Sequence, residues 1–168
     1  ERYPNSAVIY ACKAFISVAL AQLFKEEGLG LDVVSGGELA VAQRVDFPPE
    51  KIYFHGNNKG REELEMALDY GIGRVVVDNF HEIDILGEIA SRRGVVQDVL
   101  LRVSPGIDPH THVYTTTGVL DSKFGFPIET GQAREAVKRA MMERSMSVVG
   151  LHFHLGSPIF ELEPYSRA

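Results

Sequence analysis

One unit repeats along this chain of 168 residues: a short β-branched run, then a stretch of helical periodicity, then a glycine. Strict alternation of strands and helices with short connections predicts a parallel sheet whose strands are joined by helices. The expected strands are residues 7–14, 31–35, 51–56, 74–79, 98–104 and 147–156. The expected helices are residues 15–28, 36–45, 61–71, 80–94 and 130–144.

Apolar residues recur within these helices at the helical period of 3.6 residues, which predicts the face that each helix buries. Asn79 directly precedes the helix 80–94, and Glu82 follows three positions later, a spacing typical of a capping box. The residues expected to face the core are Ile16, Leu20, Leu23 and Phe24 in the first helix, Leu64, Ala67 and Leu68 in the third, and Ala133, Ala136, Val137, Ala140 and Met141 in the last.

Charge and composition exclude several classes of protein. A formal net charge of −6 does not favour a nucleic-acid partner, and no apolar run reaches the roughly 18 residues that a membrane span needs. The single cysteine, Cys12, cannot form an internal disulfide and fits a reducing, cytoplasmic environment. The first residues show neither a signal-peptide pattern nor an initiator Met, so we expect sequence to be missing upstream.

Two architectures fit a parallel sheet of this kind, an open doubly wound sheet and a (β/α)8 barrel. The chain offers five strand–helix units and one further strand, whereas a closed barrel takes about 250 residues, so length favours the open sheet. However, polar residues end every expected strand, as at the mouth of barrel enzymes, and an open sheet more often concentrates them at one point. We therefore expect an α/β chain that forms about the first six strands of a (β/α)8-type TIM barrel. The strand-end residues are Lys13, Asp32, Ser35, His55, Asp78, Asn79, Arg102 and His154.

Lys13 ends the apolar run of the first expected strand. A lysine at such a position often reaches solvent along its alkyl stem. In a dry environment, by contrast, the pKa of the amine falls and the neutral amine becomes a nucleophile that condenses with an aldehyde. Alternation places Lys13 on one face with Ile9 and Ala11, and turns Tyr10 and Cys12 towards the helices. These small or apolar neighbours leave room for an aldehyde cofactor, and we expect the amine to be held away from water.

The last expected strand carries His152 and His154, whose imidazoles alternation places on one face. Three interpretations fit the pair: histidines that line a polar mouth, a zinc pair, or one imidazole stacked on a flat cofactor ring. Gly156 and Ser157 follow at the next turn, where backbone N–H groups and a hydroxyl suit a phosphate, which a metal site does not need. The residues that would complete a zinc site are His55 and Asp78.

Three loops also carry polar residues. The glycine pair 36–37 is more typical of a tight turn than of a phosphate loop, because the full glycine pattern is missing. Residues 54–60 combine an imidazole, two amides and a lysine in one turn, which favours ligand recognition. The long polar loop 105–127 is typical of a functional lid, and we expect His110 and His112 within it to face solvent or substrate.

Six segments carry a resemblance when they are taken together: "YACKA", "DVVSGGEL", "FHGNNK", "VSPGIDPHTH", "DSKFGF" and "GLHFHLGS". In this order and spacing they resemble the pyridoxal-phosphate barrel decarboxylases, a family that includes ornithine and arginine decarboxylases and, more distantly, alanine racemase. The segments "FHGNNK" and "DPHTH" sharpen the resemblance to the diaminopimelate decarboxylase branch. The resemblance covers nearly the whole chain.

The resemblance implies the cofactor pyridoxal 5′-phosphate and the decarboxylation of meso-2,6-diaminopimelate to L-lysine and CO2, the last step of lysine biosynthesis. Lys13 would bind the aldehyde of the cofactor covalently, and His154 would stack on its ring; both would be catalytic residues. Gly156 and Ser157 would hold the phosphate. The full set of implied cofactor-binding residues is Lys13, Asp32, His55, Arg102, His154, Gly156 and Ser157, with Ser35, Asn57 and Lys59 as weaker matches.

The resemblance also implies parts that lie outside this chain: a glycine-rich phosphate turn, an acidic residue for the pyridine nitrogen, and a C-terminal β domain that completes the site of a neighbouring subunit. We therefore expect residues 1–168 to be a partial pyridoxal-phosphate-binding barrel domain from a cytoplasmic homodimer, inactive alone. Three hypotheses stay open beside this one: another basic amino-acid decarboxylase of the ornithine or arginine type, a metal-dependent barrel hydrolase that uses His152 and His154, and a non-catalytic cofactor-binding homologue.

Overall fold

The computed structural model describes residues 4–107, 123–156 and 159–168. The strands are β1 (Ile9–Ala11), β2 (Gly30–Val33), β3 (Ile52–Phe54), β4 (Arg74–Val77), β5 (Gln97–Ser104), β6 (Phe126–Pro127) and β7 (Met146–His152). The helices are α1 (Val18–Glu26), α2 (Gly36–Arg44), α3 (Arg61–Tyr70), α4 (Phe80–Arg93), α5 (Gln132–Met142) and α6 (Glu163–Arg167), with short 3₁₀ turns η1 (Cys12–Ala14) and η2 (Pro49–Lys51).

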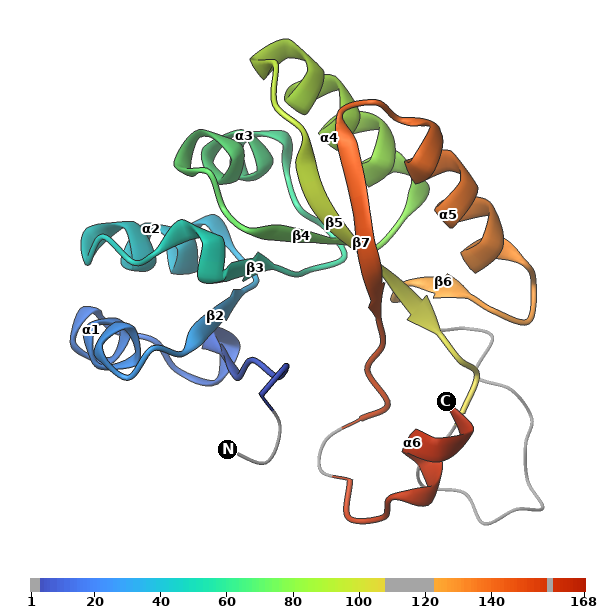
Figure 1. The fold of residues 1–168 in the computed structure, drawn as a ribbon, viewed down its shortest axis with the longest axis horizontal. Coiled ribbons are helices and arrows are strands. Elements are labelled where there is room, and N and C mark those ends of the chain that lie inside the picture. The colour runs from blue at the N-terminus through green and yellow to red at the C-terminus, as the bar shows by residue number, and fades with distance from the viewer. Residues whose placement is uncertain (1–3, 108–122, 157–158) are drawn as a thin grey trace.

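The strands form one parallel sheet in the order β1-β2-β3-β4-β5, and β6 and β7 both pair with β5. Figure 1 shows the strands along the inner side of an arc whose outer side carries the helices α1 to α5. This arrangement confirms the expected fold class, an α/β chain that forms part of a barrel. No helix in the described ranges is long and apolar enough to cross a membrane.

Every expected strand and helix is present, but several boundaries differ. The first strand ends at Ala11, and the residues Cys12–Ala14 form η1, so Lys13 lies on a 3₁₀ turn and not on a strand. The last expected strand, β7, ends at His152 and does not reach residue 156. Strand β6 was not expected, because two residues, one of them a proline, give no alternation signal.

The core lies between the sheet and the helices. The expected inward face of α3 is confirmed, since Leu64, Ala67 and Leu68 are buried. The expected burial of Leu23 on α1 and Met141 on α5 is wrong, because these side chains are 48% and 70% exposed. Helices α1 and α5 stand at the two ends of the arc, where each has a neighbouring helix on one side, α2 for the first and α4 for the last.

Candidate active site

Three polar side chains lie near the carboxyl ends of their strands: Asp32 on β2, Arg102 on β5 and His152 on β7. On β5, half-buried residues such as Arg102 alternate with fully buried ones such as Leu101 and Val103, which join the core under the helices. Arg102 and His152 are direct partners in the parallel register of β5 and β7. With His55, these three side chains form a polar group that we call the mouth.

His55 lies in the turn after β3 and connects two other members of the mouth. Its Nε2 is 3.6 Å from Oδ1 of Asp32, and its ring meets the ring of His152 edge-on, with centroids 4.5 Å apart. Asp32 Oδ1 and His152 Nδ1 are buried and have no hydrogen-bond partner among the described residues. Buried polar atoms without a partner are costly, so the mouth fits a ligand that brings polar groups to it, as pyridoxal 5′-phosphate does.

Burial controls the charges in the mouth. It raises the pKa of Asp32 to about 7, although the positive charges of Lys13 and Arg102 oppose the rise. Burial, followed by neighbouring charges, lowers the pKa of His55 to about 3 and that of His152 to about 4. Both imidazoles are therefore neutral near pH 7, and Asp32 exchanges a proton in the physiological range.

Lys13 is exposed on η1, so the prediction that its amine is held away from water is wrong for this chain. Strand β1, which precedes η1, ends the sheet on that side, and within the described residues no further strand pairs with it. The amine still acts on the mouth, because its charge lowers the pKa of Asp32 and of His154. Cys12 is buried and Tyr10 packs against the core, as alternation predicted.

His154 lies beyond the end of β7 and is exposed. The strand ends at His152, so His154 is not part of it. The prediction that both imidazoles lie on one face of the strand is therefore wrong. Burial and then the charge of Arg102 lower the pKa of His154. Gly156 has a φ of 141°, a conformation that favours glycine. Ser157 lies outside the described residues.

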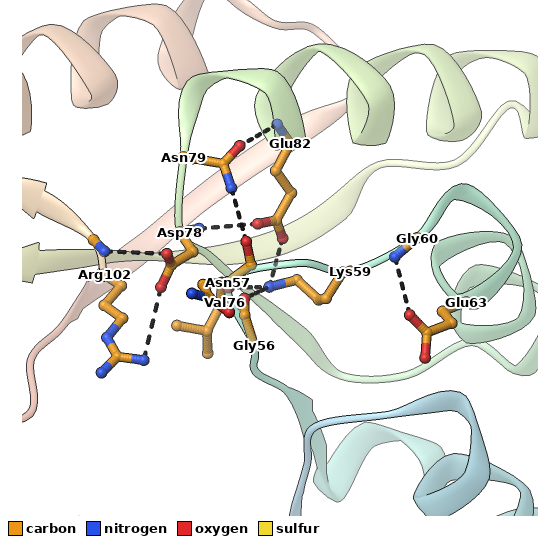
Figure 2. Close-up of polar contacts among 11 residues, drawn as sticks. Gly56, Asn57, Lys59, Gly60, Glu63, Val76, Asp78, Asn79, Glu82 and Arg102 are labelled. Carbon is orange, nitrogen blue, oxygen red and sulfur yellow. Dashed lines mark hydrogen bonds and ion pairs between the residues drawn. The ribbon is translucent and has the colours of Figure 1, made fainter. Parts of the chain in front are cut away.

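The polar residues of the turn 54–60 divide into two groups, because His55 lies in the mouth whereas Lys59 lies behind it. Lys59 is buried and its ammonium lies 2.7 Å from the carboxylate of Glu82, so the ligand-recognition interpretation is wrong for this residue. Asn57 donates a hydrogen bond of 3.3 Å to the backbone carbonyl of Lys123. Figure 2 shows these side chains in the polar network behind the mouth.

Two turns at this edge are built in the same way. Ser35 and Asn79 cap α2 and α4 by accepting hydrogen bonds from the backbone N–H groups of Glu38 and Glu82. The cap at Asn79 is as predicted, but the carboxylate of Glu82 accepts from the N–H of Asp78 and not from that of Asn79. Glu38 has the same role before α2, where its carboxylate accepts a hydrogen bond of 2.8 Å from the N–H of Val34. The sequence did not single out Glu38, although an acid three positions after a capping residue is a signal for such a contact.

The zinc interpretation has no ligand set in the part of the chain that the structure describes. No group of three or more His, Cys, Asp and Glu side chains among the described residues, which include His55, Asp78, His152 and His154, could hold a metal ion. His110 and His112 lie outside the described residues, as does most of the expected lid.

The chain is similar to known proteins over nearly its whole length. The profile of the family described as "Pyridoxal-dependent decarboxylase, pyridoxal binding domain" matches residues 1–168. The diaminopimelate decarboxylases of Bacillus methanolicus and Bacillus subtilis (strain 168) are 56% and 54% identical over 157 residues, which cover 94% of this chain and 36% of each relative. Diaminopimelate decarboxylase from M. jannaschii in co-complex with L-lysine superposes with a TM-score of 0.87 at 36% identity, covering 98% of this chain and 39% of that chain.

The chain therefore spans little more than a third of the length of the curated relatives it matches. Within that span, the chain folds into part of a parallel barrel, as the sequence resemblance implied. Because the family model matches the chain from residue 1 to residue 168, the chain belongs to the pyridoxal-dependent decarboxylases.

Proposed function

We propose that this chain forms the first part of the cofactor-binding barrel of a diaminopimelate decarboxylase, which releases CO2 from meso-2,6-diaminopimelate and yields L-lysine. The observation that carries the proposal is the identity of 56% and 54% to proteins of that name over 94% of the chain. The similar M. jannaschii enzyme is in co-complex with L-lysine, which supports L-lysine as the product.

Within this proposal, pyridoxal 5′-phosphate supplies the conjugated ring that takes up the electron pair left when CO2 departs. Lys13 would hold the cofactor covalently through its amine, and the residue is exposed and so accessible to a ligand. Asp32, with a pKa of about 7, would supply a carboxyl group that can hold or release a proton within the mouth. The remaining cofactor contacts are assigned to His55, Arg102, His154, Gly156 and Ser157.

Arg102 shapes this site electrostatically. The guanidinium is a fixed positive charge that helps to keep His152 and His154 neutral, since it lowers the pKa of both. A neutral imidazole packs on an aromatic ring without the desolvation cost of a cation. The orphaned Nδ1 of His152 offers one further polar contact to a ligand in the mouth.

The proposal extends to the parts that complete such an enzyme. We propose that residues 1–168 are joined to the remaining strands of the barrel and to a C-terminal β domain, and that the enzyme is a cytoplasmic homodimer. The length of the relatives supports the first part, because the matched segment is 36% of each of them. The single buried thiol of Cys12 fits a reducing compartment.

The test uses the full-length protein that carries this chain, purified with pyridoxal 5′-phosphate and assayed for CO2 release. We expect turnover of meso-2,6-diaminopimelate with L-lysine as product, much slower turnover of ornithine and arginine, and none in a Lys13→Ala variant. Preference for ornithine or arginine would replace the substrate assignment. Cofactor retention without CO2 release from any of the three would contradict a catalytic function.

A further inference from the structure

Behind the mouth lies a buried ion pair whose ammonium is fully used. The side chain of Lys59 is 1% exposed, and its Nζ lies 2.7 Å from Oε1 of Glu82. The same ammonium donates to the backbone carbonyls of Gly56 at 2.6 Å and Val76 at 2.8 Å. An ammonium has three hydrogens, so Lys59 has none left for a ligand. The pair therefore ties the turn after β3 to the start of α4.

Glu82 connects this ion pair to the backbone of Asp78. Its second carboxylate oxygen accepts a hydrogen bond of 3.0 Å from the backbone N–H of Asp78, and its own N–H donates to the capping side chain of Asn79. Figure 2 shows Asp78 between the Lys59–Glu82 pair on one side and Arg102 on the other. The backbone at Asp78 is thus fixed from the helix side.

The carboxylate of Asp78 points towards the mouth side of this network. Oδ2 accepts a hydrogen bond of 3.1 Å from the N–H of Gly125, and Oδ1 lies 3.7 Å from Nη1 of Arg102. Arg102 is held on another side by the ring of Phe124, whose centroid is 4.5 Å from its guanidinium carbon. Asp78 is 3% exposed, which is too little for contact with a substrate.

We propose that Asp78 is a positioning residue: its carboxylate fixes the guanidinium of Arg102 at the edge of the mouth and holds the segment 123–125 beside it. The proposal rests on the function proposed above, because Arg102 acts there on the bound cofactor. Asp78 contributes through Arg102 and not through contact with cofactor or substrate. Its effect on the mouth therefore requires the guanidinium to be present.

The test is a double-mutant cycle in the full-length protein. Asp78→Asn removes the charge that faces Arg102 but keeps an oxygen that accepts from Gly125, and Arg102→Met removes the guanidinium. Asp84→Asn is the matched control. Asp84 also lies on α4, and its substitution breaks an exposed ion pair with Arg139 of α5. Three quantities are measured: the Kd of pyridoxal 5′-phosphate by equilibrium dialysis, kcat/KM for meso-2,6-diaminopimelate, and the position of Arg102 in crystals of Asp78→Asn.

We expect Asp78→Asn alone to weaken cofactor affinity and kcat/KM about tenfold or more, and to change either by less than about twofold when Arg102 is already Met. In the crystal, the guanidinium should leave residue 78 while the backbone of 123–125 stays in place. The Asp84→Asn control should change neither quantity. Equal losses in both backgrounds, or an unmoved Arg102 in the crystal, would overturn the proposal.

These measurements distinguish a failure of the proposed function from a failure of the proposed role of Asp78. If the parent protein binds pyridoxal 5′-phosphate but releases no CO2, the proposed function fails, while the cofactor affinities still complete the cycle and decide the role of Asp78. If the parent decarboxylates its substrate and the two substitutions are additive, the role of Asp78 fails and the proposed function stands.

Discussion

Burial in the mouth shifts the pKa of Asp32 strongly. Its pKa is raised to about 7 in the fold, against about 3.9 in an unfolded chain. The folded state therefore keeps this proton while the unfolded state loses it, so the contribution of Asp32 to stability is present below pH 4 and lost as the pH rises to 7. The free energy of unfolding of an Asp32→Asn variant should therefore rise relative to that of the parent between pH 4 and pH 7, by up to about 4 kcal/mol. Above pH 7 this difference should stay constant.

Chemical denaturation of the parent and of Asp32→Asn at pH 4, 5.5 and 8 measures this difference. His55 provides a control of opposite sign, because its pKa is lowered to about 3 and its contribution is lost as the pH falls below about 6.5. A His55→Asn variant should therefore gain on the parent as the pH falls. A stability difference for Asp32→Asn that does not vary with pH would contradict the burial argument.

Lys59 is the residue whose loss should cost most stability behind the mouth. In a Lys59→Met variant, Glu82 stays buried without its partner, and removal of one member of a buried ion pair costs about 3–5 kcal/mol. The free energy of unfolding measures the loss. Arg93→Met is the control, since it breaks an exposed pair with Asp69 and should change little.

Adding Glu82→Gln to Lys59→Met should restore most of the lost stability, because a neutral amide still accepts from the N–H of Asp78. If the double variant is no more stable than the single one, the cost lies in packing around Lys59 and not in the unpaired charge.

At the scale of elements, Gly125 and Gly131 test how closely the segment after the long loop fits β5. Both have left-handed backbones, with φ of 72° and 80°. A Cβ at position 125 would lie 2.6 Å from the carbonyl oxygen of Arg102, whereas one at position 131 would have nothing within 4 Å. Both alanine variants carry the left-handed penalty, but Gly125→Ala should cost about 1–3 kcal/mol more by urea denaturation. Equal costs would mean that this segment does not pack as described.

The order and type of the elements were predictable because local signals set them. Gly71 and Gly94 end α3 and α4 in left-handed conformations, and Asn79 caps α4. The 3₁₀ turn at Lys13 and the use of Lys59 were not predictable, because both depend on neighbours that are distant in the sequence. The strand-end pattern predicted the barrel and placed Asp32, His55 and Arg102 together, but it carried no information about which polar residues are paired behind the mouth.

At the scale of the whole molecule, the sheet ends in an edge strand at β1 within the described residues. Exposed apolar side chains lie near both ends of the arc, including Phe15 at 63% and Leu151 at 58%. An edge of this kind favours pairing with another segment. The chain is thus expected to need the rest of the barrel for its site.

The chain alone should therefore show no measurable decarboxylase activity, since the proposed site needs residues from later strands and a second domain. The assay is CO2 release from meso-2,6-diaminopimelate by the isolated chain, beside the full-length protein at equal concentration with saturating pyridoxal 5′-phosphate. Turnover by the isolated chain close to that of the full-length protein would show that these 168 residues already hold a complete site.

The proposed function depends most directly on the amine of Lys13. The full-length protein is mixed with pyridoxal 5′-phosphate and reduced with borohydride, and the modified lysine is located by mass spectrometry. We expect the label on Lys13, with Lys25 and the exposed Lys138 largely unmodified. Labelling of Lys13 no stronger than that of Lys25 and Lys138 would contradict it.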